Sequence, residues 1–182
     1  MTSLPRVLTL LAPDFEELEV VAPVDLMRRA GITVTLAALD SCLQVKGRNG
    51  LILQADTTLD EVINEAFECL FLPGGPGVNT LRKDERITPL IKRYSSKELW
   101  IVAICAAPLL LNDAGLLKEK TFTAHHSVRS ELPDFLESKA VVIDGYIITS
   151  RGAGTAVQLG LSLIEHLVSL EKAKEIAFSI SY

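Results

Sequence analysis

The chain has 182 residues, of which 48% are hydrophobic and 23% charged, and its formal net charge at pH 7 is −5. This length suits one domain, residues 1–182, with a core of ordinary size. The chain is acidic overall and has no basic run with interleaved aromatic residues, a pattern typical of nucleic-acid binding. We therefore expect no nucleic-acid partner.

Nothing in the sequence indicates a membrane segment or a disulfide framework. The longest apolar run, residues 100–111, is shorter than the roughly 20 residues of a membrane-crossing helix and contains Pro108. Residues 7–12 are too few for the apolar core of a signal peptide, and acidic residues follow them. Three cysteines without a repeated spacing argue against paired disulfides and structural zinc. We therefore expect a cytoplasmic protein with free thiols and no membrane partner.

Strand and helix patterns alternate along the first half of the chain without a linker or an internal repeat. Residues 17–30 carry apolar side chains at helical spacing, and Gly31 follows them, as at many helix ends. The short apolar run 69–72 ends abruptly in the turn residues 73–77. In chain order the patterns predict a strand at 6–11, a helix at 17–30, strands at 33–38 and 51–53, a helix at 59–66 and a strand at 69–72.

The second half continues the alternation. Helical patterns run through Tyr94, and Asp144-Gly145 is the strongest short hairpin signal in the chain. The patterns predict a strand at 100–104, a helix at 108–114, strands at 141–143 and 146–149, and helices at 155–167 and 171–178. Strands that read as nearly continuous hydrophobic runs between helices indicate an α/β fold, with a mostly parallel sheet covered by helices on both faces.

Cys105 lies where a buried strand is expected to turn sharply into a helix. Ala106 and Ala107 leave room for a tight turn, and Pro108 is tolerated in a first helical turn. A helix N-terminus directs backbone N–H groups at the preceding residue, which favours a thiolate and predicts an accessible thiol with a lowered pKa. The alternative is a buried structural cysteine, the usual state of a free thiol.

Other chemically capable groups are expected at the same edge of the sheet, because ligands of open α/β sheets bind outside the carboxyl ends of the strands. Glu19 stands in a mostly apolar register, so its carboxyl is expected to point inward and to stay protonated. The N–H groups of Gly74 and Gly75 are candidates to face developing negative charge, although simple turn chemistry is the alternative. His125 and His126 complete the set, and their adjacency alone predicts no metal site.

Five ordered motifs resemble the ThiJ/PfpI superfamily, and within it the branch of the parkinsonism-associated protein deglycase and bacterial YajL. The resemblance covers about residues 6–177. The motifs are Glu16-Glu17-Leu18-Glu19, the segment from Ala22-Pro23 to Gly31, Leu72-Pro73-Gly74-Gly75, Ala103-Ile104-Cys105-Ala106-Ala107-Pro108, and Thr149-Ser150-Arg151-Gly152-Ala153-Gly154-Thr155.

The resemblance implies a flavodoxin-like, class I glutamine amidotransferase-like three-layer sandwich. In it Cys105 is the reactive cysteine on a strained elbow, Glu19 is hydrogen-bonded to its sulfur, and His125 lies nearby. The N–H groups of Gly75 and Ala106 line an anion or oxyanion site.

The resemblance also implies a homodimer that packs partly through the first helix. In that dimer Asp25 of the second subunit approaches His125. Arg28 and Arg48 match basic positions near the interface.

The activities implied for this branch are cofactor-independent conversion of methylglyoxal or glyoxal to hydroxy acids, repair of early glycation adducts, and protection against oxidative stress through cysteine oxidation. A non-catalytic redox sensor or chaperone that uses the same cysteine is the alternative. Protease or amidase activity is disfavoured, because family peptidases have a histidine where this chain has Ala106. His126 stands where relatives in the branch commonly have proline, which puts the shape of that loop in question.

Overall fold

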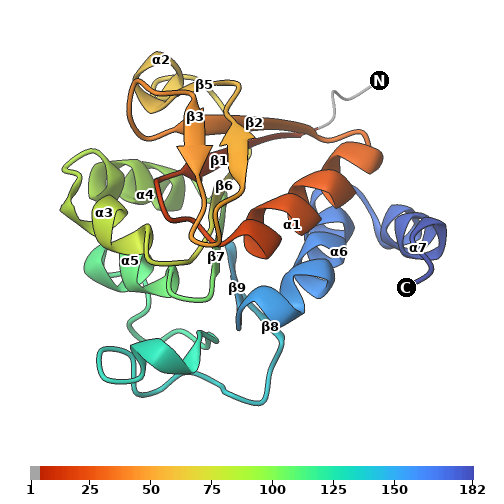
Figure 1. Cartoon of the computed structure of the whole chain (residues 1–182). Coiled ribbons are helices and arrows are strands. Elements are labelled where there is room, and N and C mark those ends of the chain that lie inside the picture. The colour runs from red at the N-terminus through yellow and green to blue at the C-terminus, as the bar shows by residue number, and fades with distance from the viewer. Residues whose placement is uncertain (1–4) are drawn as a thin grey trace.

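The computed structural model describes residues 5–182, and its main sheet has seven strands (Figure 1). Their spatial order is β5-β2-β1-β6-β7-β9-β8, and all neighbouring pairs are parallel except the antiparallel pair β8 and β9. A separate antiparallel pair joins β3 and β4. The strands are β1 (Arg6–Leu11), β2 (Thr33–Ala38), β3 (Gln44–Lys46), β4 (Ile52–Gln54), β5 (Thr57–Thr58), β6 (Cys69–Leu72), β7 (Trp100–Ile104), β8 (Val141–Asp144) and β9 (Ile147–Ser150).

Helices cover both faces of the main sheet and bury two separate hydrophobic clusters (Figure 1). Successive side chains of β1 pack on opposite faces of the sheet, because the side chains of a strand alternate between its two sides. Leu8 and Leu10 pack in the cluster of α2 (Leu59–Val62), α3 (Val78–Lys83), α4 (Ile87–Ser96) and α5 (Pro108–Asp113). Val7 and Leu11 pack in the cluster of α1 (Glu17–Arg29), α6 (Ala156–Leu167) and α7 (Leu170–Ser179). The predicted three-layer sandwich is confirmed.

The strand order reverses at β1, which lies between β2 and β6. The chain passes from β1 to β2 on one side and, after β5, returns to β6 on the other side of β1, and such a switch point opens a crevice at the carboxyl ends of the strands. The segments that follow β1, β6, β7 and β9 all emerge at this edge. Two short 3₁₀ helices lie in the second half of the chain: η1 (His126–Val128) between α5 and β8, and η2 (Ala153–Thr155) between β9 and α6. This edge is where the candidate site forms.

Most predicted elements are observed, and four predicted strands, β1, β2, β6 and β7, have the expected bounds. The helix predicted at 59–66 ends at Val62, because only Leu59 and Val62 of this stretch are buried and no further apolar face exists for another turn. The strands β3 and β5 were not predicted, since two or three residues are too few to establish an alternating pattern. No helix within residues 5–182 combines the length and the apolar character needed to cross a membrane.

Candidate active site

Cys105 occupies the sharp turn between β7 and α5, as predicted. Its φ of 65° lies in the left-handed region, which is costly for a residue with a side chain and is found mostly at functional sites. Two backbone hydrogen bonds hold this conformation: the Cys105 N–H donates to the Ser150 carbonyl (2.9 Å), and the His125 N–H donates to the Cys105 carbonyl (2.9 Å). The elbow is thus tied to β9 on one side and to the His125 segment on the other.

Glu19 points inward from the first turn of α1 and is fully buried. Its Oε2 accepts the Gly74 N–H (2.9 Å), whereas its Oε1 has no hydrogen-bond partner in the described part of the chain. Glu16 caps the helix by accepting the Glu19 N–H (3.0 Å), which fixes the start of α1. Burial raises the pKa of Glu19 to about 7, although contacts with the Cys105 thiol and the Gly74 N–H act in the opposite direction.

Cys105 is 9% exposed, and its side chain lies close to the Glu19 carboxyl, since both approach the Cβ position of Gly74. Burial raises the pKa of the Cys105 thiol to about 12, and the nearby Glu19 carboxyl acts in the same direction. The N–H groups of Gly75 and Ala106 lower this pKa, as the helix-start argument predicts, but burial outweighs them. The expectation of an accessible thiol with a lowered pKa is therefore wrong for this structure. The thiol instead has a buried carboxyl beside it that can accept its proton.

His125 lies on the other side of the elbow, with its ring held by Ser127. The Ser127 N–H donates to Nδ1 (3.3 Å), and the Ser127 hydroxyl lies 2.9 Å from the same nitrogen. Burial lowers the pKa of His125, and the nearby positive charges of His126 and Arg48 add to this effect. A neutral ring whose Nδ1 accepts a hydrogen bond carries its proton on Nε2, so His125 can act as a donor there.

Glycines allow these groups to approach one another. A Cβ on Gly74 would lie 2.5 Å from Glu19 Oε2 and 2.6 Å from Cys105 Cβ. A Cβ on Gly152 would lie 3.2 Å from the His125 ring and 4.0 Å from the Cys105 sulfur. The N–H of Gly74 is occupied by Glu19, so of the three predicted backbone donors only Gly75 and Ala106 face the sulfur.

The remaining predicted residues separate into two groups. Arg48 lines the pocket, and its guanidinium makes no hydrogen bond or ion pair with any group of residues 5–182. Asp25 pairs with Arg29 on the exposed side of α1 (2.7 Å). Arg28 donates to the Val34 carbonyl (2.9 Å) and to Asp56 (3.1 Å). Within this chain Asp25 and Arg28 do not reach the pocket.

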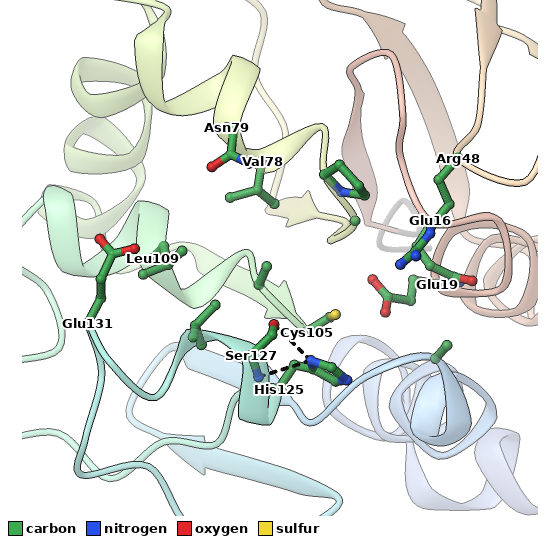
Figure 2. A pocket seen from close by; sticks show the side chains of 15 residues that line it. Glu16, Glu19, Arg48, Val78, Asn79, Cys105, Leu109, His125, Ser127 and Glu131 are labelled. Carbon is green, nitrogen blue, oxygen red and sulfur yellow. Dashed lines mark hydrogen bonds between the residues drawn. The ribbon is translucent and has the colours of Figure 1, made fainter.

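The pocket has a volume of about 540 Å³ and contains most of the predicted residues (Figure 2). The sequence did not predict Ser127, the apolar residues Val78, Leu109 and Val128, or the rim residues Asn79 and Glu131, because they reach the pocket only through tertiary packing. Of these, only Ser127 has a local sequence signal, since it follows His125 by two residues and such a spacing suits a turn in which it caps the ring nitrogen. The lining consists of Glu16, Glu19, Arg48, Gly75, Pro76, Val78, Asn79, Cys105, Ala106, Leu109, His125, Ser127, Val128, Glu131 and Ala153.

In the described residues, no three side chains of His, Cys, Asp or Glu are grouped so that they could hold a metal ion. The other two cysteines lie apart from the pocket: Cys42 is exposed, and Cys69 is fully buried within β6. The groups available for chemistry in the pocket are thus a thiol, a buried carboxyl, an imidazole and two backbone N–H donors.

Known proteins resemble this chain in sequence and in fold. The model of the DJ-1/PfpI family matches residues 5–166. Protein dj-1beta of Drosophila melanogaster is 37% identical over 174 residues, which cover 93% of each chain. Glutathione-independent glyoxalase DJR-1.2 of Caenorhabditis elegans is 33% identical over 181 residues, 97% of this chain and 96% of the other. The crystal structure of Drosophila melanogaster DJ-1beta superimposes with a TM-score of 0.94 at 36% identity and covers 98% of each chain.

Proposed function

The chain belongs to the DJ-1/PfpI family, and from this membership and the site geometry we propose that it is a cysteine-dependent, cofactor-independent enzyme of the glyoxalase or deglycase type. Its substrates would be methylglyoxal, glyoxal or early glycation adducts, and its products from the aldehydes would be 2-hydroxy acids. The observation that carries the proposal is that Cys105 and the buried Glu19 carboxyl line the same pocket and approach each other at Gly74, whose Cβ position lies 2.5 Å from Glu19 Oε2 and 2.6 Å from Cys105 Cβ. That pairing suits a nucleophile and its base.

The first step would join the sulfur to the substrate. The Glu19 carboxylate takes the thiol proton as the Cys105 sulfur forms a bond to the aldehyde carbon, and the carbonyl electrons move to oxygen. The N–H groups of Gly75 and Ala106, which are directed at the sulfur, would stabilise this oxyanion. The proton then passes from Glu19 to the oxygen, which gives a hemithioacetal and restores the carboxylate.

The second step would move hydrogen between adjacent carbons. The Glu19 carboxylate removes the proton from the former aldehyde carbon, and the neighbouring carbonyl becomes an enediolate oxygen. Glu19 returns the proton to the second carbon, while the first hydroxyl passes its proton to the second oxygen, which gives a 2-hydroxy thioester. The His125 Nε2–H is the donor we assign to the second oxygen. Water then attacks the thioester, the sulfur leaves with a proton, and no external oxidant or reductant is consumed.

The proposal is tested by lactate formation from methylglyoxal without glutathione in metal-free buffer. We expect Cys105→Ser and Glu19→Ala each to abolish turnover while circular dichroism remains that of the wild type. Cys42→Ser is the matched control, because it removes an exposed thiol outside the pocket. Wild-type rates in either pocket variant would reject the mechanism.

A redox sensor or chaperone that uses the same cysteine is a second candidate. The observation that favours it is the environment of the sulfur: the N–H groups of Gly75 and Ala106 are directed at it, and Glu19 Oε1 has no partner within residues 5–182. These groups would stabilise oxygen atoms added to the sulfur. The candidate predicts that mild peroxide oxidises Cys105 before Cys42 and Cys69. Unselective oxidation by mass spectrometry would count against it.

We also propose that the protein forms a homodimer through α1 and the β3–β4 hairpin. Leu18 on α1 and Ile52 on β4 are 59% and 62% exposed. Val21, about one helical turn after Leu18, and Leu51, directly before Ile52, are exposed as well. The two elements adjoin, because the Glu17 carboxylate accepts the N–H of Asn49 from the hairpin turn (2.6 Å). Large apolar side chains from adjoining elements are typical of an interface between copies.

A further inference from the structure

One wall of the pocket is apolar and comes from three separate elements. Val78 begins α3, Leu109 lies in the first turn of α5, and Val128 ends η1. These residues are only 2%, 4% and 6% exposed, so most of each is packed in the hydrophobic core, and this packing fixes the position of the wall. All three residues line the pocket.

The groups required by the proposed reaction lie elsewhere in the pocket. Figure 2 shows Val78 and Leu109 on one side of Cys105, and Glu19 and Arg48 on the other. The apolar wall therefore supplies no proton donor, acceptor or charge to the reaction. Beyond it, Asn79 and Glu131 form a polar rim, where Arg82 holds Glu131 by an ion pair (2.8 Å).

The volume of the pocket exceeds the need of a three-carbon dicarbonyl. A water molecule takes roughly 30 Å³ in the liquid, so about 540 Å³ holds a substrate several times the size of methylglyoxal. Methylglyoxal bound to Cys105 would leave water in the space beside Val78, Leu109 and Val128. A longer apolar substituent would displace that water, bury its own apolar surface against these residues and gain hydrophobic free energy.

We propose that this wall is a specificity subsite for 2-oxoaldehydes whose ketone carbon carries an apolar chain of several carbons. The inference rests on the proposed function, because the aldehyde carbon must bond to the Cys105 sulfur for the substituent to reach the wall. The reaction is the same, and 2-oxohexanal would give 2-hydroxyhexanoate.

The test compares kcat/KM for 2-oxohexanal and methylglyoxal. Each buried methylene favours binding by roughly fourfold, so the wild type is expected to prefer 2-oxohexanal at least tenfold. Val78→Thr and Val128→Thr keep the shape of the side chain and replace one methyl group by a hydroxyl. Each is expected to lower the preference at least threefold. Val142→Thr, a buried valine of β8 outside the pocket, is the matched control and should leave the preference unchanged.

The outcomes separate the inference from the proposed function. If the wild type turns over methylglyoxal but shows no preference for 2-oxohexanal, the specificity subsite is rejected and the enzyme assignment stands. If the two pocket variants lower kcat/KM equally for both substrates, the wall does not select the substituent and the inference is also rejected. If folded, reduced wild type turns over neither aldehyde, the proposed function fails and the subsite fails with it.

Discussion

Two neighbouring acids, Cys105 and Glu19, determine the chemistry of the pocket at the scale of single residues. When two acids lie side by side, a negative charge on one disfavours ionisation of the other. The pair therefore carries one negative charge more readily than two. Burial raises both pKa values, Glu19 to about 7 and Cys105 to about 12. The carboxyl therefore ionises first, and in that state it can take the thiol proton when the sulfur attacks a substrate.

The raised pKa of Glu19 predicts a pH dependence of stability. A carboxyl with a pKa of 4.5 in the unfolded chain and about 7 in the folded chain binds its proton more tightly when folded. Its contribution to the free energy of unfolding is complete below pH 4.5 and is lost as the pH rises through 7. Between pH 4.5 and 8 the wild type should lose up to about 3 kcal/mol relative to Glu19→Gln. Urea unfolding of both proteins measures this difference, and parallel pH profiles would contradict it.

At the scale of elements, the turn from β7 into α5 places the Cys105 thiol at the carboxyl-end edge of the sheet. The positive φ of Cys105 is held by hydrogen bonds to Ser150 and His125, so the strain is supported by two neighbouring segments. The loop after β6 contributes Gly74, whose N–H positions the Glu19 carboxyl. The site thus depends on backbone geometry as much as on side-chain identity.

The strained backbone at Cys105 predicts that a glycine variant is more stable than an alanine variant, which is the reverse of the usual order within a strand or helix. Glycine adopts a φ of 65° without penalty, whereas alanine there costs about 1 kcal/mol. Cys105→Gly should therefore unfold with a free energy about 1 kcal/mol above that of Cys105→Ala. Cys69, within β6, is the control position, and there the alanine variant should be the more stable. The same order at both positions would argue against strain at the elbow.

The close approach at Gly74 predicts that Gly74→Ala damages the site. Its Cβ would meet Glu19 Oε2 at 2.5 Å and the Ile104 carbonyl oxygen at 2.7 Å, and the backbone atom cannot move freely. We expect a loss of about 1 to 3 kcal/mol in the free energy of unfolding and at least a hundredfold loss of methylglyoxal turnover. Gly154→Ala is the control, because nothing lies within 4 Å of its Cβ position. Equal activity in the two variants would contradict the geometry.

At the scale of the whole molecule, the sheet order places β1 at the switch point and collects the segments after β1, β6, β7 and β9 at one edge. The proposed dimer surface on α1 lies on the same helix that carries Glu19. Assembly and catalysis would then share one element, which links the oligomeric state to the position of the carboxyl.

The dimer proposal predicts that Leu18→Asp and Val21→Asp shift the protein toward monomer at micromolar concentration. A charge in a buried apolar interface is strongly unfavourable, so the dissociation constant should rise at least tenfold. Sedimentation velocity measures the change. Leu136→Asp, a substitution of another exposed leucine away from α1, should sediment like the wild type. A wild type that is monomeric at all concentrations would contradict the proposal.

Much of the fold was predictable from the sequence, because each central strand is a continuous apolar run with clear ends. The runs at 69–72 and 100–104, for example, end at Pro73 and at the Cys105 turn and match β6 and β7. The short strands β3 and β5 are set by tertiary pairing and carry too few residues for a local signal.

The site was predictable only in part. Cys105 and Glu19 have local signals, namely a strand-to-helix junction and an acid in an apolar register. The raised pKa of Cys105 was not predictable, since it depends on the burial and the carboxyl that tertiary packing supplies. The apolar wall of Val78, Leu109 and Val128 likewise forms only when α3, α5 and η1 meet.

The proposed function requires Cys105 to bond covalently to the substrate during turnover, and acid-quenched mass spectrometry detects such a bond. Samples are taken from the first turnover onward while the enzyme converts methylglyoxal to lactate, and the low pH preserves thioesters. We expect a lactoyl group on the Cys105 peptide that disappears when the substrate is consumed, with Cys42 and Cys69 unmodified. If lactate accumulates while Cys105 stays unmodified at every time point, the covalent mechanism is rejected.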